Sequence, residues 1–133
     1  MSIIFPYRYK ESHFGPLPDL RIPILVETIQ GWHLFRFIVD SGSEVTIVSR
    51  SMADYTGFSF KNSSMYLITG VGDKDLRVYE GSLRIRIGPY EVNIPTFYSS
   101  QERTPFLLGR TGVFDFFNIT FDNREKSIRF DLI

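Results

Sequence analysis

The sequence predicts an all-β protein with a single domain. Of its 133 residues, 51 are β-branched or aromatic, against a single alanine, Ala53. Helical bundles and coiled coils need Ala, Leu, Glu and Lys in quantity, so this composition favours strands. An apolar fraction of 43% is too high for a disordered chain. The length suits one domain with one core.

Charge and cysteine content exclude several functional classes. The 15 Lys and Arg residues balance the 15 Asp and Glu residues, so the basic excess that binds phosphates is missing. A chain without cysteine has no disulfides, no thiol nucleophile and no zinc–thiolate site. The first ten residues do not resemble a secretion signal, and no apolar run approaches about 20 residues. We therefore expect a cytoplasmic protein that binds neither nucleic acid nor membrane.

The first 19 residues are expected to be irregular. Pro6, Gly15, Pro16 and Pro18 all disfavour regular structure. The sequence thus predicts an irregular N-terminal arm over residues 1–19, followed by one domain over residues 20–133.

From Leu20 onward, period-2 alternation predicts about nine strands. Ile22, Ile24 and Val26 give the first strand one apolar face, and the second, residues 33–39, is apolar on both faces near its end, as buried strands are. Further strands are expected at 45–48, 65–68, 76–87, 92–97, 118–121 and 127–132, with a helix at 51–56 and one or two helical turns at 112–117.

Metal, cofactor and triad chemistry find little support in the residues. His13 and His33 are the two histidines, and no cysteine or regular carboxylate spacing accompanies them. A Ser-His-Asp triad built on Ser41 or Ser43 with His33 would lack the Gly-x-Ser-x-Gly elbow. We expect no metal and no cofactor.

Asp40 is the candidate catalytic residue. Asp-Ser-Gly is most simply a turn, because all three residues favour turns. Here, however, the tripeptide stands between two apolar strands, residues 37–39 and 45–48. A carboxylate held between buried strands is costly unless it is hydrogen-bonded or shares a proton, and such costly placement is often functional.

Four segments in order resemble the retropepsin-like aspartic proteases, and the bacterial single-domain members most of all. FIVDSGS at 37–43 resembles the catalytic loop of that family, and ITGVG at 68–72 resembles the tip of its flap hairpin. TPFLLGR at 104–110 is similar to the apolar-apolar-Gly-Arg segment behind the catalytic loop, and residues 112–130 resemble the closing helix and interface strands. The resemblance implies a closed acid-protease barrel with a flap hairpin, one short C-terminal helix and C2 homodimer assembly.

The same resemblance implies an aspartic endopeptidase that acts on an extended peptide or protein substrate. Such catalysis needs two carboxylates that share a proton, and Asp-Ser-Gly occurs once in this chain, so the second must come from a second copy. Asp40 would be catalytic. Ser41, Gly42, Ser43, Glu44 and Arg110 would support its loop, with an ion pair between Glu44 and Arg110; Ile38, Gly70, Val71, Gly72, Pro105 and Leu107 would bind substrate.

Two alternatives stay open from the residues alone. A catalytically inactive retropepsin-fold module could serve dimerisation or peptide binding, because fold does not fix function. A small-ligand β-barrel, in which Asp40 would have a structural role, is the second alternative.

Overall fold

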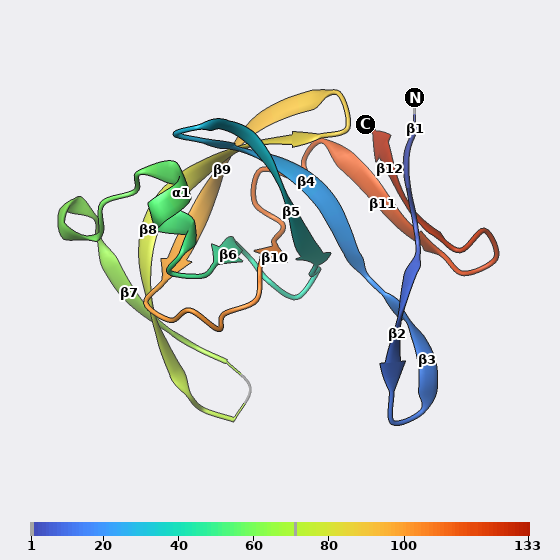
Figure 1. Cartoon of the computed structure of the whole chain (residues 1–133), viewed down its shortest axis with the longest axis horizontal. Coiled ribbons are helices and arrows are strands. Elements are labelled where there is room, and N and C mark those ends of the chain that lie inside the picture. The colour runs from blue at the N-terminus through green and yellow to red at the C-terminus, as the bar shows by residue number, and fades with distance from the viewer. Residues whose placement is uncertain (1, 71) are drawn as a thin grey trace.

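The computed structural model describes residues 2–70 and 72–133, and its centre is a ring of six strands. Neighbours around the ring pair in the order β4, β5, β10, β6, β9, β8, and a pairing between β4 and β8 closes it. The expected all-β closed barrel is therefore confirmed (Figure 1). The six strands are β4 (Arg21–Thr28), β5 (Gly31–Val39), β6 (Thr46–Val48), β8 (Asp75–Ile87), β9 (Tyr90–Ser99) and β10 (Leu107–Leu108).

The core lies inside this ring and follows from the alternation of the strands. Ile22, Ile24 and Val26 of β4 are fully buried, as are Ile85 and Ile87 of β8. Since alternate side chains of a strand point to opposite faces, the residues between them are left toward solvent. The apolar face expected from the sequence is thus the inner wall of the barrel.

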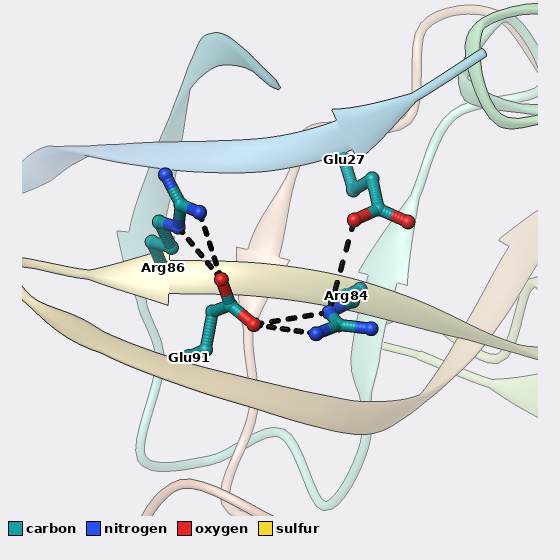
Figure 2. A network of polar contacts seen from close by, with 4 residues as sticks. All are labelled: Glu27, Arg84, Arg86 and Glu91. Atoms are coloured by element: carbon teal, nitrogen blue, oxygen red, sulfur yellow. Dashed lines mark hydrogen bonds and ion pairs between the residues drawn. The ribbon is translucent and has the colours of Figure 1, made fainter. Parts of the chain in front are cut away.

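An exposed polar network lies at the seam where β8 meets β4 and β9 (Figure 2). Glu91 accepts hydrogen bonds from Arg84 at 2.6 Å and from Arg86 at 2.8 Å. These bonds hold the pKa of the Glu91 carboxyl below its ordinary value, Arg84 contributing most. Arg84 also lies 3.7 Å from Glu27 of β4, and the Arg86 guanidinium lies 4.0 Å from the ring centre of Trp32.

The prediction that residues 1–19 are irregular is wrong, because they form three strands. The first, β1 (Ser2–Pro6), pairs with β12 (Ser127–Leu132), which pairs in turn with β11 (Phe117–Asp122). Phe5 and Tyr7 are buried in the common core, and prolines are tolerated on the edge strands that result. The other two, β2 (Arg8–Ser12) and β3 (Gly15–Asp19), form a separate hairpin.

The expected helix at 51–56 is confirmed as α1 (Met52–Thr56). Gly57 ends α1 in the left-handed conformation, and a short 3₁₀ turn, η1 (Phe60–Asn62), follows. Over the described residues of the expected C-terminal helix no regular helix forms, but two single helical turns do, in which the N–H groups of Phe114 and Phe117 donate to the carbonyls of Arg110 and Val113. Residues 111–116, all described, form consecutive turns, because Gly112 takes a φ of 80° that no α-helix continues through. Among the described residues, none of the helices has the length and hydropathy to cross a membrane.

One hairpin leads from the fold to the site. β7 (Met65–Thr69) pairs with the first part of β8, with Thr69 opposite Asp75. Its tip falls in the 69–73 segment where the sequence predicts a break, and Val71 lies outside the described residues. The hairpin projects from the barrel on the side where β5 ends (Figure 1).

Candidate active site

Asp40 follows directly after β5 and is held in place by β10, which lies beside it. The Asp40 N–H donates to the carbonyl of Leu108 at 3.0 Å, and the Ile38 N–H donates to the carbonyl of Phe106 at 2.9 Å. These bonds extend the parallel pairing in which Leu108 faces Val39. Partly buried Asp40 is thus fixed at the end of a buried strand by main-chain bonds to the segment that contains β10.

The turn after Asp40 folds back onto its carboxylate. The Gly42 N–H donates to Asp40 Oδ1 at 2.9 Å, and the Ser43 N–H donates to the Asp40 carbonyl at 3.2 Å. A Cβ at position 42 would lie 3.2 Å from the same Oδ1, so a larger residue would crowd the carboxylate. This is the turn that Asp-Ser-Gly favours, with the carboxylate orientation fixed by a backbone donor.

Residues 109–111 brace the turn from behind. The Gly109 N–H donates to Thr46 Oγ1 at 3.0 Å, and a Cβ on Gly109 would lie only 2.6 Å from the Val45 carbonyl oxygen. Only glycine fits so close an approach of two backbones. The Arg110 N–H donates to the Ser43 carbonyl at 2.9 Å, and Thr111 donates to the Glu44 carbonyl through both its N–H and its Oγ1.

The ion pair expected between Glu44 and Arg110 does not form. Both side chains are described and exposed, and no contact within 4.0 Å joins their charged groups. Their segments are joined instead by the main-chain bonds of Ser43, Glu44 and Thr111, which need no charge. Solvent screens an exposed pair and makes it worth little, so the side chains remain free to point elsewhere.

A cleft of about 710 Å³ opens beside the Asp40 turn. This volume lies in the range of ligand-binding pockets, and most of the cleft wall is apolar. The charged residues that line it are Asp40, Glu44 and Lys74. The other lining residues are Gly42, Ser43, Val45, Ile47, Ile68, Thr69, Gly70, Leu76, Phe97 and Leu107.

The structure brings half of the predicted site residues together at this cleft. Asp40, Gly42, Ser43, Glu44, Gly70 and Leu107 line it. Ile38, Ser41, Gly72, Pro105 and Arg110 do not, and Val71 lies outside the described residues. The Ser41 side chain is exposed, and among the described residues of this chain its hydroxyl has no hydrogen-bond partner.

Sequence reasoning missed seven lining residues, and part of the signal was present. Ile68 pairs with Leu76 across the β7–β8 hairpin, so both side chains share one face of it. Alternation along the two strands could have placed them in the cleft. Ile47 and Phe97 are opposite each other in the parallel pair of β6 and β9, which local sequence does not reveal.

Metal chemistry has no donor set at this cleft. Among residues 2–70 and 72–133, no group of three or more His, Cys, Asp or Glu side chains is placed to hold an ion. The arrangement offers one carboxylate, oriented by a backbone N–H, at the edge of an apolar cleft with a hairpin beside it. Such a group can take a proton from a water molecule or give one to a carbonyl oxygen.

Comparison with known families adds one match. A family model described as gag-polyprotein putative aspartyl protease matches residues 27–112, which span the Asp40 turn, the β7–β8 hairpin and the 109–111 brace. None of the curated proteins matches the chain.

Two solved structures share the fold. One is the crystal structure of a retropepsin-like aspartic protease from Rickettsia conorii, with a TM-score of 0.63 and 17% identity over 98% of this chain and 89% of that one. The other is the EIAV protease complexed with the inhibitor HBY-793, with a TM-score of 0.51 and 13% identity over 68% of this chain and 80% of that one. At such identities the likeness shows the fold alone.

Proposed function

This chain belongs to the retropepsin-like aspartic proteases, and from that membership we propose that it is an endopeptidase whose active site forms between two copies. The observation that carries the proposal is the position of Asp40. Its carboxylate lies at the edge of an apolar cleft, fixed by the Gly42 N–H and by β10, and the chain contains a single Asp-Ser-Gly. One such carboxylate is half of the pair that aspartic proteolysis requires.

The chemistry divides the acid and base roles between the two copies of Asp40. Two adjacent carboxylates cannot both ionise cheaply, so the pair holds one proton and titrates as a unit. The ionised Asp40 takes a proton from a water molecule as its oxygen attacks the scissile carbonyl carbon, and the protonated one donates to the carbonyl oxygen. The tetrahedral intermediate then collapses: the C–N bond breaks, and the leaving nitrogen takes up a proton from the pair.

The cleft suits an extended peptide with apolar side chains. Ile68 and Leu76 line the cleft from one face of the β7–β8 hairpin. Ile47, Phe97 and Leu107 line it from the barrel strands β6, β9 and β10. A peptide laid along the hairpin would bind as an added strand, with main-chain bonds for affinity and pockets for alternate side chains.

The first experiment compares the wild type with Asp40→Asn on an apolar peptide library at acidic and neutral pH. We expect kcat/KM to fall by about 10² to 10⁴-fold, the usual contribution of a general acid or base. Asp54→Asn, an exposed carboxylate of α1, is the matched control and should cleave like the wild type. Equal cleavage by the wild type and Asp40→Asn would overturn the proposal.

Subunit mixing tests whether the site is shared. Wild type and Asp40→Asn are unfolded together in equal amounts, refolded and assayed at a concentration that keeps them dimeric. If each site needs both copies of Asp40, about a quarter of the dimers are active, whereas independent sites would retain about a half of the activity. Residual activity near a half would therefore reject the shared dyad.

A further inference from the structure

The β2–β3 hairpin stands apart from the core and carries exposed apolar side chains. Phe14 at its tip is 85% exposed, Tyr9 is 54% exposed and Leu17 is 40% exposed. No residue between 8 and 19 belongs to the hydrophobic core or to the side chains packed against it. Exposed apolar side chains gathered on a hairpin outside the core form a surface that a partner would cover.

The hairpin is nevertheless built as a fixed arm, with an anchored root and a closed tip. At the root, the buried Tyr7 donates its N–H to the Lys126 carbonyl at 2.8 Å and its hydroxyl to Asn123 Oδ1 at 3.0 Å. At the tip, Ser12 Oγ donates to the Gly15 carbonyl at 2.7 Å and accepts the Phe14 N–H at 3.0 Å. The arm therefore presents Phe14 in a defined place, at little cost in ordering on binding.

The β3 edge of this arm is poorly suited to strand addition. Two of the five residues of β3, Pro16 and Pro18, have no N–H to donate, and β2 is its one sheet neighbour in the described chain. Prolines on an edge strand block the pairing of another strand there. The apolar contacts that this arm offers are the exposed side chains of Tyr9, Phe14 and Leu17. The zero net charge of the chain adds no overall repulsion between two copies.

The position of the hairpin indicates what it binds. In Figure 1 the β2–β3 and β7–β8 hairpins project from the same side of the molecule, and the Asp40 turn between β5 and β6 lies between them. Under the proposed function, a second copy brings its own Asp40 to this turn. It must therefore approach the side of the molecule from which the β2–β3 hairpin projects.

We propose that the β2–β3 hairpin is an arm that clasps the second copy of this chain, with Phe14 as its main contact and Tyr9 and Leu17 beside it. The proposal rests on the shared active site proposed above. Because a C2 dimer uses the same patch twice, each arm grips the other protomer and every substitution in it counts twice. An aromatic anchor buried on association carries a large share of the binding energy of such a contact.

The test measures the dimer dissociation constant by sedimentation equilibrium for the wild type, Phe14→Ser and the double variant Tyr9→Ser/Leu17→Ser. Phe14→Ser should raise the constant by about tenfold or more, and the double variant should raise it as well. Ile29→Ser, 71% exposed in the turn between β4 and β5, is the matched control and should leave it unchanged. Circular dichroism of each variant checks that the fold is intact, which the exposure of Phe14 leads us to expect.

A spin label at the tip gives a second readout that does not depend on weakened binding. The chain has no cysteine, so His13→Cys, at an exposed position beside Phe14, can be labelled at a single site while Phe14 is kept. The label should be mobile in dilute monomer and immobilised as the protein concentration passes through the dimer dissociation constant. A label that stays mobile in the dimer overturns the proposal.

The outcomes separate this proposal from the protease proposal. If cleavage depends on Asp40 while both hairpin variants dimerise like the wild type, the arm is rejected and the protease stands. If the hairpin variants weaken a dimer that cleaves nothing, the arm stands and the protease is rejected. Variants that cleave faster at unchanged mass would mean that the hairpin covers the cleft, and a wild type that is monomeric at every concentration would overturn the arm.

Discussion

The Asp40 turn (residues 40–45) and the seam where β8 meets β4 and β9 belong to the same ring of strands, yet different forces hold them. The turn is fixed by main-chain hydrogen bonds from Gly42, Arg110 and Thr111 and by the close approach of Gly109. The seam carries charged side chains, with Glu91 between two arginines and exposed to solvent (Figure 2). Backbone donors hold most of the turn, which leaves the exposed Ser41 side chain without a bond to the described residues of its chain, whereas the side chains of the seam are committed to one another.

This difference teaches where substitutions should act. Changing a side chain in the turn should alter activity or assembly and leave the barrel stable. Changing the backbone support behind the turn should unfold the site, and changing the seam should alter stability alone. Three substitutions test this division.

The largest effect is expected from Gly109→Ala. A methyl group there would lie 2.6 Å from the Val45 carbonyl oxygen and 2.7 Å from the Thr46 nitrogen, both backbone atoms that cannot turn aside. We expect a loss of about 3 kcal/mol in the free energy of unfolding, with cleavage lost as well. Urea unfolding measures the first quantity. Gly70→Ala, where a Cβ would meet nothing within 4 Å, should retain wild-type stability; equal losses in the two variants would contradict the role given to Gly109.

Ser41→Ala should have an intermediate effect, on assembly rather than on folding. The Ser41 hydroxyl is exposed and has no partner among the described residues of its own chain, which leaves it free to bond across the axis of the proposed dimer. Losing one such bond on each side should raise the dimer dissociation constant by about tenfold, with monomer stability unchanged. Ser43→Ala is the control, because Ser43 Oγ already donates to the Val45 carbonyl at 2.7 Å within the chain. If both variants dimerise like the wild type, Ser41 has no role across the axis.

The smallest effect is expected from Glu91→Gln at the seam. The pKa of Glu91 lies below its ordinary value of 4.5, chiefly because of Arg84 and then Arg86. Ionised Glu91 therefore stabilises the fold above pH 4.5, and this contribution is lost as the pH falls below 4.5 and the carboxylate is protonated. The variant should melt slightly below the wild type at pH 7, and the gap should shrink as the pH falls below 4.5.

Trp32 gives the readout for that comparison, because the Arg86 guanidinium lies 4.0 Å from its ring centre and it is the single tryptophan of the chain. Added salt should narrow the gap at pH 7, since exposed charges are screened. Glu102→Gln, an exposed carboxylate in a loop, should melt like the wild type. A gap that persists at low pH would show that the seam is not held by charge.

Local sequence predicted the parts of the molecule that depend on local rules. The alternation of Ile22, Ile24 and Val26 gave the inner face of β4, and the Asp-Ser-Gly turn after a buried strand gave the position of Asp40. In both cases the residues within a few positions decide the structure: the side-chain period of a strand is 2, and Asp and Gly favour turns.

The parts that local sequence did not predict depend on pairing between distant segments. The first N-terminal strand forms because β1 pairs with β12, more than 120 positions further along the chain. In this pair Ile3 is opposite Phe130. The prolines of this segment indicated irregular structure, but edge strands accept prolines that central strands exclude. The cleft wall formed by Ile47 and Phe97 likewise needs the β6–β9 pairing. The failure of the Glu44–Arg110 pair shows that adjacent backbones do not bring their side chains together.

The two-residue strand β10 has a consequence for the order of folding. It lies between β5 and β6, and its Leu107 pairs with Ile38 and Ile47, some 60 to 70 positions earlier in the chain. Closing so long a loop is slow, because the entropic cost precedes the reward of contact. The N–H groups of Ile38 and Asp40 find their acceptors in residues 106–108 alone, so the turn cannot be ordered before that strand is inserted. An unfinished chain emerging from the ribosome therefore carries Asp40 long before the turn around it can be ordered, which waits until residues 106–108 have been made and paired with β5.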